Sequence, residues 1–216
     1  MIKATLWDFG GVILSSPFAA FSRYEKQCGL PDGFIRRLNA SNHHMNAWAH
    51  LERGDITFDE FCDRFESEAR QAGGELDARQ VMGLLSGDVR PAMVDALRRC
   101  HERLRTALLT NNFITGDRGG SGGDHPGILA LFDVVIESSK AGVRKPDPRF
   151  YAMACDALGI RPDEAVFLDD LGINLKPARE MGMTTIKVTD PGRALDELQE
   201  VVGFPLRRNS RLASRI

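Results

Sequence analysis

Each of three apolar, strand-like runs in the sequence ends in residues that can bind metals or phosphate. These residues are Asp8 after the first run, Thr110 and Asn111 after the second, and Asp169 and Asp170 after the third. Lys145 lies in a loop shortly after a further run of this kind. Because ligands of open α/β sheets bind just outside the carboxyl ends of the strands, we expect these side chains to share one edge of a sheet.

Such a set of side chains favours phosphoryl chemistry. Three carboxylates at one edge would repel one another, and each would tend to take up a proton. Mg²⁺ removes that repulsion and prefers one or two carboxylates with waters and a substrate phosphate. The hydroxyl, amide and ammonium groups nearby can donate hydrogen bonds to phosphoryl oxygens. We therefore expect a carboxylate to attack phosphorus and form an aspartyl phosphate that water later cleaves, while metal and Lys145 spread the transition-state charge.

Single residues of this region also have simpler structural interpretations. An Asp followed by glycines, as at Asp8, often caps a turn, and by itself it supports either interpretation equally. Asn174 fits equally well as a helix cap or as a contact of the metal site. Arg144 is more typical of a solvated charge than of a phosphate ligand. The chemical interpretation therefore depends on the convergence of several strand ends.

The composition indicates a globular protein of a reducing compartment. The chain has 216 residues, 27% charged and 43% hydrophobic, which fits one domain or one domain with an insert. Its net charge of −2 creates no overall field for nucleic acid or an acidic membrane surface. No apolar run approaches the ~18 residues of a membrane span, and because the sequence opens directly into a predicted strand we expect no signal peptide. The four cysteines lie far apart, so we expect reduced, mostly buried thiols in a cytoplasmic protein.

Strands and helices alternate along most of the chain, which predicts a Rossmann-like α/β core with a parallel sheet and right-handed crossovers. The expected strands are residues 4–7, 104–110, 133–137, 165–168 and 184–188. One expected helix begins near residue 91, and the others span residues 128–132, 149–158, 175–181 and 194–202. The glycine-rich stretch 116–127 lacks the spacing of a phosphate-binding loop, so we interpret it as a mobile connection.

An all-helical insert interrupts this alternation and is expected to cap the strand ends. Thr57 and Glu60 have the spacing of a capping box, which predicts a helix start. A further helix is expected over 76–85. The predicted division is residues 1–15 and 89–206 for the core, 16–88 for the cap and 207–216 for a flexible tail.

Four motifs in the sequence resemble those of the haloacid dehalogenase superfamily of hydrolases. They read WDFGGV, LLTNN, VRKPDPRFY and VFLDDLGINLKPAREMG. The match covers nearly the whole chain, with the cap placed as in the first cap type of the family. Within the family, the last two motifs are most similar to the N-terminal phosphatase domain of soluble epoxide hydrolases and the N-terminal hydrolase-like domain of a mammalian acyl-CoA dehydrogenase family member.

This resemblance implies a role for each residue at the strand ends. Asp8 would be the nucleophile and a metal ligand, Thr110 and Asn111 would bind the phosphoryl group, and Lys145 would neutralise it. Asp170 would be the main further ligand of Mg²⁺, with Asp169 beside it and the main-chain carbonyl of Gly10 facing the ion. The implied activity is a Mg²⁺-dependent phosphatase acting on a small phosphorylated molecule.

One position departs from the pattern of the family. Its phosphatases usually carry a second Asp two residues after the nucleophile, and that Asp protonates the leaving group and then activates water. Here this position is Gly10, which has no side chain. General acid–base catalysis is typically worth ~10²–10⁴-fold in rate, so a group from the cap or the substrate would have to replace it.

Some cap residues offer candidates for the missing group and for a substrate pocket. His43, His44 and His50 could supply the proton, although surface or satisfied core histidines are the more common interpretation. Trp48 and the stripe Phe58, Phe61 and Phe65 could line a pocket, but their helical spacing favours core packing.

Two other functions compete with the phosphatase. A 2-haloacid dehalogenase displaces halide through the same aspartate without metal, which would leave Asp169 and Asp170 with little to do. A catalytically weakened module that binds a phosphorylated ligand would explain Gly10, since function belongs to the site and not to the fold. The sequence leaves the substrate open, and also whether the chain is a monomer or a homodimer.

Overall fold

The computed structural model describes residues 1–112 and 125–207. Its centre is a sheet of five parallel strands in the order β3-β2-β1-β4-β5. The strands are β1 (Ala4–Trp7), β2 (Arg105–Thr110), β3 (Val134–Glu137), β4 (Ala165–Asp169) and β5 (Thr184–Lys187). Every residue of β1 and β4 is buried, which explains why these strands read as continuous apolar runs. The Rossmann-like parallel sheet expected from the alternation is confirmed.

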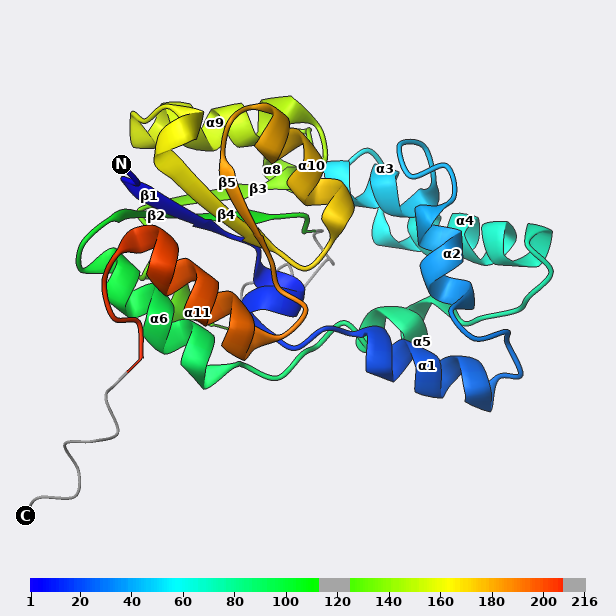
Figure 1. Ribbon diagram of the computed structural model, residues 1–216. Coiled ribbons are helices and arrows are strands. Elements are labelled where there is room, and N and C mark those ends of the chain that lie inside the picture. Colours follow the sequence, from blue (N-terminus) through cyan, green and yellow to red (C-terminus); the bar gives the residue numbers. More distant parts are fainter. Residues whose placement is uncertain (113–124, 208–216) are drawn as a thin grey trace, which may run out of the picture.

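Helices cover both faces of the sheet (Figure 1). On one face lie α6 (Pro91–His101) and α11 (Pro191–Val202), whose apolar sides pack into one cluster with β1 and β4. On the other face lie α9 (Pro148–Leu158) and α10 (Gly172–Glu180), whose buried residues form a second cluster with the sheet. Each of the first three starts with a proline, which suits the first helical position because it lacks the N–H that would remain unpaired there.

The segment 16–88, called the cap below, consists of helices with a hydrophobic cluster of their own. They are α1 (Phe18–Gln27), α2 (Phe34–Ala40), α3 (Ala47–Arg53), α4 (Phe58–Gln71) and α5 (Ala78–Gly83). The predicted capping box of Thr57 and Glu60 starts α4. Phe61 and Phe65 are buried on α4 and pack edge-on against Trp48 of α3. In Figure 1 the cap helices stand beside the strand ends, joined to the sheet by two extended segments.

These two segments pair with each other where the chain enters and leaves the cap. Leu14 and Val89 form an antiparallel bridge. The Ser15 amide donates to the Asp88 carbonyl at 2.8 Å, and the Arg90 amide donates to the Ile13 carbonyl at 2.9 Å. Both covalent links between cap and core therefore run through one short two-stranded ribbon.

Several boundaries differ from the expectation. The loop after β3 contains a short helix, α8 (Ser138–Ala141), that the sequence pattern did not predict, because a single turn carries no periodicity. The predicted helix 128–132 is the earlier turn α7 (Pro126–Leu129), because Pro126 begins it. Helix α10 begins three residues before its predicted start, at Gly172. The predicted helix 76–85 is shorter, because Asp77 caps α5.

The remaining sequence expectations concern the glycine-rich stretch, the tail, the cysteines and the membrane. Most of the stretch 116–127 and all but the first residue of the tail 207–216 lie outside the described residues. All four cysteines are free thiols, three of them buried and Cys28 exposed. Among the helices of the described ranges, none combines the length and apolar character that crossing a membrane requires.

Candidate active site

Asp8 occupies the tip of the central strand β1. Its amide donates to the Leu168 carbonyl of β4 at 2.9 Å, so the residue still belongs to the sheet when the chain begins to turn. A single irregular helical turn, Phe9–Ile13, follows directly and leads the chain away from the strand. Because β1 is flanked by β2 and β4, the ends of all three strands meet around this carboxylate.

Three carboxylates converge at this point. One oxygen each of Asp8, Asp169 and Asp170 lies within 4.8 Å of the others. Asp169 ends β4 and is fully buried, whereas Asp170 follows it and is partly exposed to the cavity described below. The parallel register of β1 and β4 brings the three together, as the strand-end argument predicts.

Lys145 supplies the positive charge among these carboxylates. Its ammonium donates to Asp8 Oδ1 at 2.8 Å and to Asp169 Oδ2 at 2.7 Å, and its side chain is 1% exposed. The backbone of Lys145 is fixed by Asn111, whose Oδ1 accepts from the Lys145 amide at 2.9 Å and whose Nδ2 donates to its carbonyl at 3.1 Å. The side chain of Asn111 thus holds the lysine in place, and Thr110 beside it is buried at the tip of β2.

Asn174 belongs to the same network. Its Nδ2 donates to both oxygens of Asp169 at 3.0 Å, and the amide of Leu171 donates to Asp169 Oδ1 at 2.8 Å. Of the two interpretations of Asn174, the contact with the candidate metal site is the one that the geometry shows. Asp169 is therefore held from three sides, by Lys145, Asn174 and a backbone amide, which fixes its orientation.

Burial and mutual repulsion change the protonation of the carboxylates. Burial, opposed by Lys145 and assisted by Asp169 and Asp170, raises the pKa of Asp8 to about 7. Burial and the charge of Asp169 raise the pKa of Asp170 to about 6. Although its burial acts in the opposite sense, the charges of Asp169 and Asp8 raise the pKa of Lys145, which stays protonated. The site thus concentrates more negative charge than one lysine neutralises.

This donor set fits Mg²⁺. The ion takes oxygen ligands and is bound in proteins through one or two carboxylates together with water and phosphate oxygens. Asp8 and Asp170 offer such oxygens on the cavity side, while Asp169 is already engaged by its three donors. A divalent cation would also remove the repulsion that raises the two carboxyl pKa values.

Of the two glycines that follow Phe9, only one occupies a position where a residue with a side chain would not fit. Gly11 has φ +78°, and a Cβ there would overlap the carboxylate of Asp170, so this position needs glycine for both reasons. Gly10 has φ −70° and ψ 131°, which suit any residue, and an added Cβ would meet no atom within 4 Å. The backbone at Gly10 therefore does not demand glycine, and the space for a side chain is open.

A cavity of about 490 Å³, called the active-site cavity below, joins this strand edge to the cap. From the core it is lined by Asp8, Gly10, Thr110, Asn111, Lys145, Asp170 and Asn174. From the cap it is lined by the polar side chains Arg36, Asn39, His43 and Glu52 and by apolar ones that include Phe18, Trp48 and Leu85. Trp48 thus has both expected roles, since it packs in the cap core and lines the cavity.

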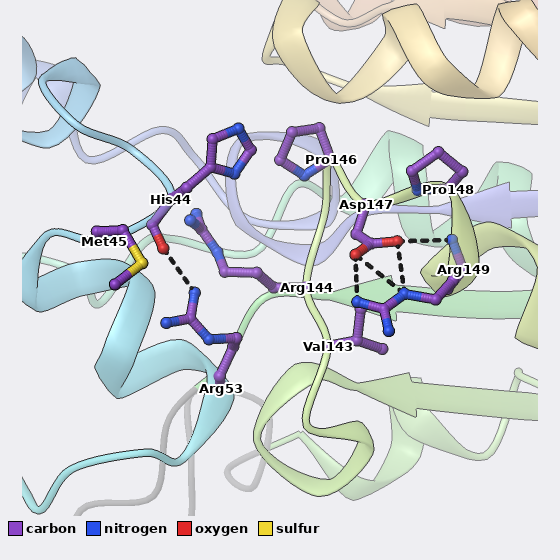
Figure 2. Close-up of a pocket in the computed structure, with 9 residues that line it drawn as sticks. All are labelled: His44, Met45, Arg53, Val143, Arg144, Pro146, Asp147, Pro148 and Arg149. Carbon is purple, nitrogen blue, oxygen red and sulfur yellow. Dashed lines mark hydrogen bonds and ion pairs between the residues drawn. The ribbon is translucent and has the colours of Figure 1, made fainter.

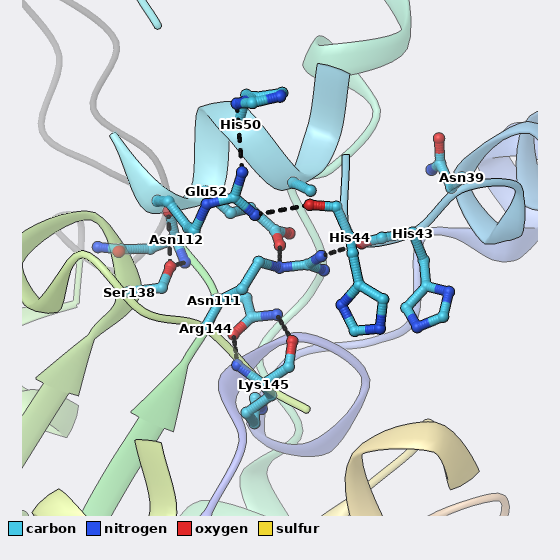
Figure 3. A network of polar contacts seen from close by, with 12 residues as sticks. Asn39, His43, His44, His50, Glu52, Asn111, Asn112, Ser138, Arg144 and Lys145 are labelled. Carbon is cyan, nitrogen blue, oxygen red and sulfur yellow. Dashed lines mark hydrogen bonds and ion pairs between the residues drawn. The ribbon is translucent and has the colours of Figure 1, made fainter. Parts of the chain in front are cut away.

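Arg144 connects the cap to the core at this cavity, which corrects its interpretation as a solvated charge. Its Nε lies 2.6 Å from Glu52 Oε2 of α3, and its Nη1 donates to the His43 carbonyl at 2.7 Å (Figure 3). The two charged side chains are only 18% and 13% exposed, because cap and core enclose them. No sequence signal pointed to this pair, because its members are far apart along the chain and neither belongs to a repeating pattern.

The three cap histidines have different surroundings. His43 lines the active-site cavity. His44 lines a separate cavity of about 400 Å³, which shares Arg144 and Pro146 with the active-site cavity (Figure 2). His50 pairs through Nδ1 with Asp55 at 2.9 Å and is not among the residues lining the active-site cavity.

Comparison with known proteins identifies the family. Residues 2–182 match the model of the haloacid dehalogenase-like hydrolases. The chain belongs to this family. The superfamily resemblance of the four motifs is thereby confirmed.

Relatives of this hydrolase fall into two groups by length. It is 35% identical to mouse acyl-CoA dehydrogenase family member 10 over 94% of this chain and 19% of that protein. It is 31% identical to pig bifunctional epoxide hydrolase 2 over 95% of this chain and 40% of that protein. The chain therefore spans less than half the length of these relatives. A Mycobacterium tuberculosis phosphatase is 34% identical, over 90% of this chain and 91% of its own.

Solved structures share the fold of this hydrolase. A predicted HAD-like hydrolase from Porphyromonas gingivalis matches with a TM-score of 0.65 and 21% identity, over 94% of this chain and 98% of its own. A Bacteroides thetaiotaomicron enzyme of the HAD family, in complex with magnesium and inorganic phosphate, matches with a TM-score of 0.59 and 21% identity, over 88% and 96%. The L-2-haloacid dehalogenase of Xanthobacter autotrophicus matches with a TM-score of 0.60 and 20% identity, over 96% and 85%. At these identities the likeness concerns the fold alone.

Proposed function

We propose that this hydrolase is a Mg²⁺-dependent phosphatase that acts on a small organic phosphate through Asp8. The observation that carries the proposal is the cluster at the tip of β1. Three carboxylate oxygens lie within 4.8 Å of one another, and the Lys145 ammonium lies 2.8 Å from Asp8 and 2.7 Å from Asp169. An anionic nucleophile, a cation site and a fixed ammonium are the groups that phosphoryl transfer needs at one place.

In the proposed reaction each residue has a distinct part. Asp8 attacks phosphorus and carries the phosphoryl group as an aspartyl phosphate until water releases it. Asp8 and Asp170 would hold Mg²⁺, which when bound would neutralise negative charge on the carboxylates and the phosphoryl oxygens. Lys145 stabilises the charge that develops in the transition state, and Thr110 binds the phosphoryl group at the tip of β2. Asn111 clamps the backbone of Lys145 through Oδ1 and one Nδ2 hydrogen, and its second Nδ2 hydrogen is left for a phosphoryl oxygen. Asp170 and the carbonyl of Gly10 complete the cation site, and Asp169 lies beside it, held by Lys145, Asn174 and the Leu171 amide.

The relatives support the phosphatase over the dehalogenase. Besides the Mycobacterium tuberculosis protein, a sesquiterpene phosphatase of Aspergillus oryzae is 29% identical over 93% of this chain and 97% of its own. A dehalogenase would not need three clustered carboxylates, since its displacement of halide uses no metal. The phospho-ligand module remains the alternative, because Gly10 leaves the site without its usual acid.

The test is hydrolysis of 4-nitrophenyl phosphate by the purified chain, with Mg²⁺ and after chelation. This leaving group is good enough to depart without a proton. We expect turnover that depends on Mg²⁺ and is abolished in Asp8→Asn, a variant that keeps the shape of the side chain but cannot attack. Turnover that survives the substitution or the chelator would overturn the proposal. Tight binding of inorganic phosphate with no turnover would favour the binding module.

A further inference from the structure

The active-site cavity contains seven titratable side chains, which can be compared as sources of the missing acid–base group. They are Asp8, Lys145, Asp170, Glu52, Arg36, Arg144 and His43. In the proposed function Asp8 is the nucleophile and Asp170 belongs to the cation site. Lys145 is held by two carboxylates at 2.8 and 2.7 Å. These three residues therefore already have other roles in the proposed reaction and do not supply the acid–base group.

Three of the remaining four are unsuited to proton transfer. Glu52 is the partner of Arg144 in an ion pair of 2.6 Å that is largely enclosed. Arg36 and Arg144 carry guanidinium groups, which do not release a proton near neutral pH. Arg36 also stacks over the ring of Phe18 at 5.2 Å from the ring centre. His43 is the only one left among the described residues that line this cavity, and its ring lies against that of His44, with the two ring centroids 4.0 Å apart.

The position of His43 is defined by the core. Arg144 Nη1 donates to the His43 carbonyl at 2.7 Å, and Arg144 is the residue directly before Lys145. The segment that carries the catalytic ammonium therefore also fixes the backbone that carries this imidazole. In Figure 3 the rings of His43 and His44 extend side by side from the cap loop, and of the two only His43 is among the residues that line the active-site cavity.

We propose that the imidazole of His43 transfers the protons required by the reaction at Asp8, in place of the side chain that Gly10 lacks. The inference rests on the proposed function. An imidazole is the side chain most often used for this task, because it exchanges a proton near neutral pH.

Two proton transfers complete the reaction. In the first step a bond forms between the Asp8 carboxylate and phosphorus, the bond from phosphorus to the ester oxygen breaks, and the imidazolium gives its proton to that oxygen. In the second step water attacks phosphorus and gives a proton to the imidazole, and the bond from phosphorus to Asp8 breaks. Inorganic phosphate and alcohol leave, and His43 is again protonated.

The surroundings of His43 set the direction of its titration. Partial burial, then the positive charges of His44 and Arg144, lower the pKa of His43. The charged groups at the same cavity are Arg36, Glu52, Arg144, Lys145, Asp8 and Asp170. A bound phosphate dianion adds negative charge there and favours the imidazolium that the first step needs.

The experiment compares two substrates that differ in leaving group, 4-nitrophenyl phosphate and phenyl phosphate, in the presence of Mg²⁺. We measure kcat/KM, which reports the steps up to formation of the aspartyl phosphate. In His43→Gln we expect kcat/KM for phenyl phosphate to fall at least tenfold more than for 4-nitrophenyl phosphate. In the unaltered protein kcat/KM for phenyl phosphate should decline as pH rises through the pKa of His43, and this decline should be absent in His43→Gln.

Two further variants make the test specific. His44→Gln is the matched control, since His44 is adjacent but lines the other cavity. It should retain the difference between the substrates, while the decline of kcat/KM should move to higher pH because one cause of the lowered His43 pKa is removed. Gly10→Asp, made in the His43→Gln protein, should restore phenyl phosphate hydrolysis, because the backbone and the open space at Gly10 accept a side chain.

The outcomes separate this inference from the proposed function. Equal losses on both substrates, or no loss, in His43→Gln would overturn the role of His43 while leaving the phosphatase intact. No Mg²⁺-dependent turnover of 4-nitrophenyl phosphate by the unaltered protein would overturn the proposed function and this inference with it.

Discussion

The two sides of the active-site cavity are built in different ways. On the core side, Asp8, Thr110 and Asp169 stand at the ends of paired strands, and their positions follow from the backbone hydrogen bonds of the sheet. On the cap side, His43 and Glu52 come from a loop and a short helix, and one arginine ties both of them to the core. The groups proposed to react are thus positioned by the fold, whereas the cap residues are positioned by a few side-chain contacts.

This difference means that the two sides should respond differently to substitution. A core substitution should change the chemistry and the charge balance without moving the neighbouring groups, because the sheet holds them. A cap substitution should act through the placement of the cap, and its effect should spread to every group that the cap carries. The following predictions test that distinction, from the largest expected effect to the smallest.

Lys145→Met removes the ammonium from between two buried carboxylates. We expect kcat for 4-nitrophenyl phosphate to fall by about 10²–10³-fold, the usual loss when a preorganised transition-state donor is removed. The carboxylates also lose their counter-charge, so their pKa values should rise further. Steady-state kinetics at saturating Mg²⁺ provide the measurement, and circular dichroism checks the fold. Activity within tenfold of the unaltered protein would contradict the role of Lys145.

The metal-free protein should lose stability as pH rises from about 4 to 7. Folding raises the pKa of Asp8 to about 7 and that of Asp170 to about 6, so the native state keeps protons that the unfolded chain releases. The free energy of unfolding therefore decreases with pH across this window, by several kcal/mol in total. Urea unfolding at several pH values measures the slope.

The same pH series with added Mg²⁺ or with Asp170→Asn is the control. Both changes reduce the repulsion among the carboxylates, so the slope should become shallower. An increase in stability between pH 4 and 7 without metal would show that the carboxylates are not proton-bound in the native state.

Arg144→Ala tests the contact between cap and core. It leaves Glu52 largely enclosed without its partner and releases the His43 carbonyl, which should cost about 2 kcal/mol of stability after allowance for partial exposure. We expect KM to rise together with the loss in kcat, because His43 and Glu52 both line the cavity. A double-mutant cycle with Glu52→Ala isolates the pair, and a coupling free energy near zero would contradict the contact.

Thr57→Ala should have the smallest effect and should leave catalysis unchanged. It removes the capping box at the start of α4, which is typically worth about 1 kcal/mol of stability. Thr57 directly precedes α4 and is not among the residues lining the active-site cavity. Thermal unfolding measures the loss, and kcat/KM for 4-nitrophenyl phosphate should match that of the unaltered protein.

The core side of the site was accessible from the sequence for a physical reason. A fully buried parallel strand reads as an apolar run, and the first polar residue after it must lie at the sheet edge. The positions of Asp8, Thr110 and Asp169 at one edge therefore follow from the sequence pattern, although their chemical roles remain predictions. The hydrogen bonds from the Asn111 side chain to the backbone of Lys145 were not predicted from the sequence, because the family resemblance assigned that side chain to the phosphoryl group.

The cap side of the site was not accessible in the same way. Arg144 reads as one charge in a basic loop, and its acceptor at His43 lies 101 residues away. Contacts of this kind depend on how the cap is oriented relative to the core, and no local pattern encodes that orientation. His43 likewise could not be separated from His44 and His50, since all three lie in one histidine-rich stretch of the cap.

The paired ribbon at residues 13–15 and 88–90 determines how the cap can move. Because both connections run side by side and are hydrogen-bonded, a displacement of one must carry the other, and sideways sliding or twisting of the cap would break the pairing. Bending of the ribbon out of its own plane keeps these hydrogen bonds, so it is the motion of the cap that meets the least resistance. Solvent viscosity should therefore slow turnover whenever this one motion, and not the chemical step, limits the escape of product.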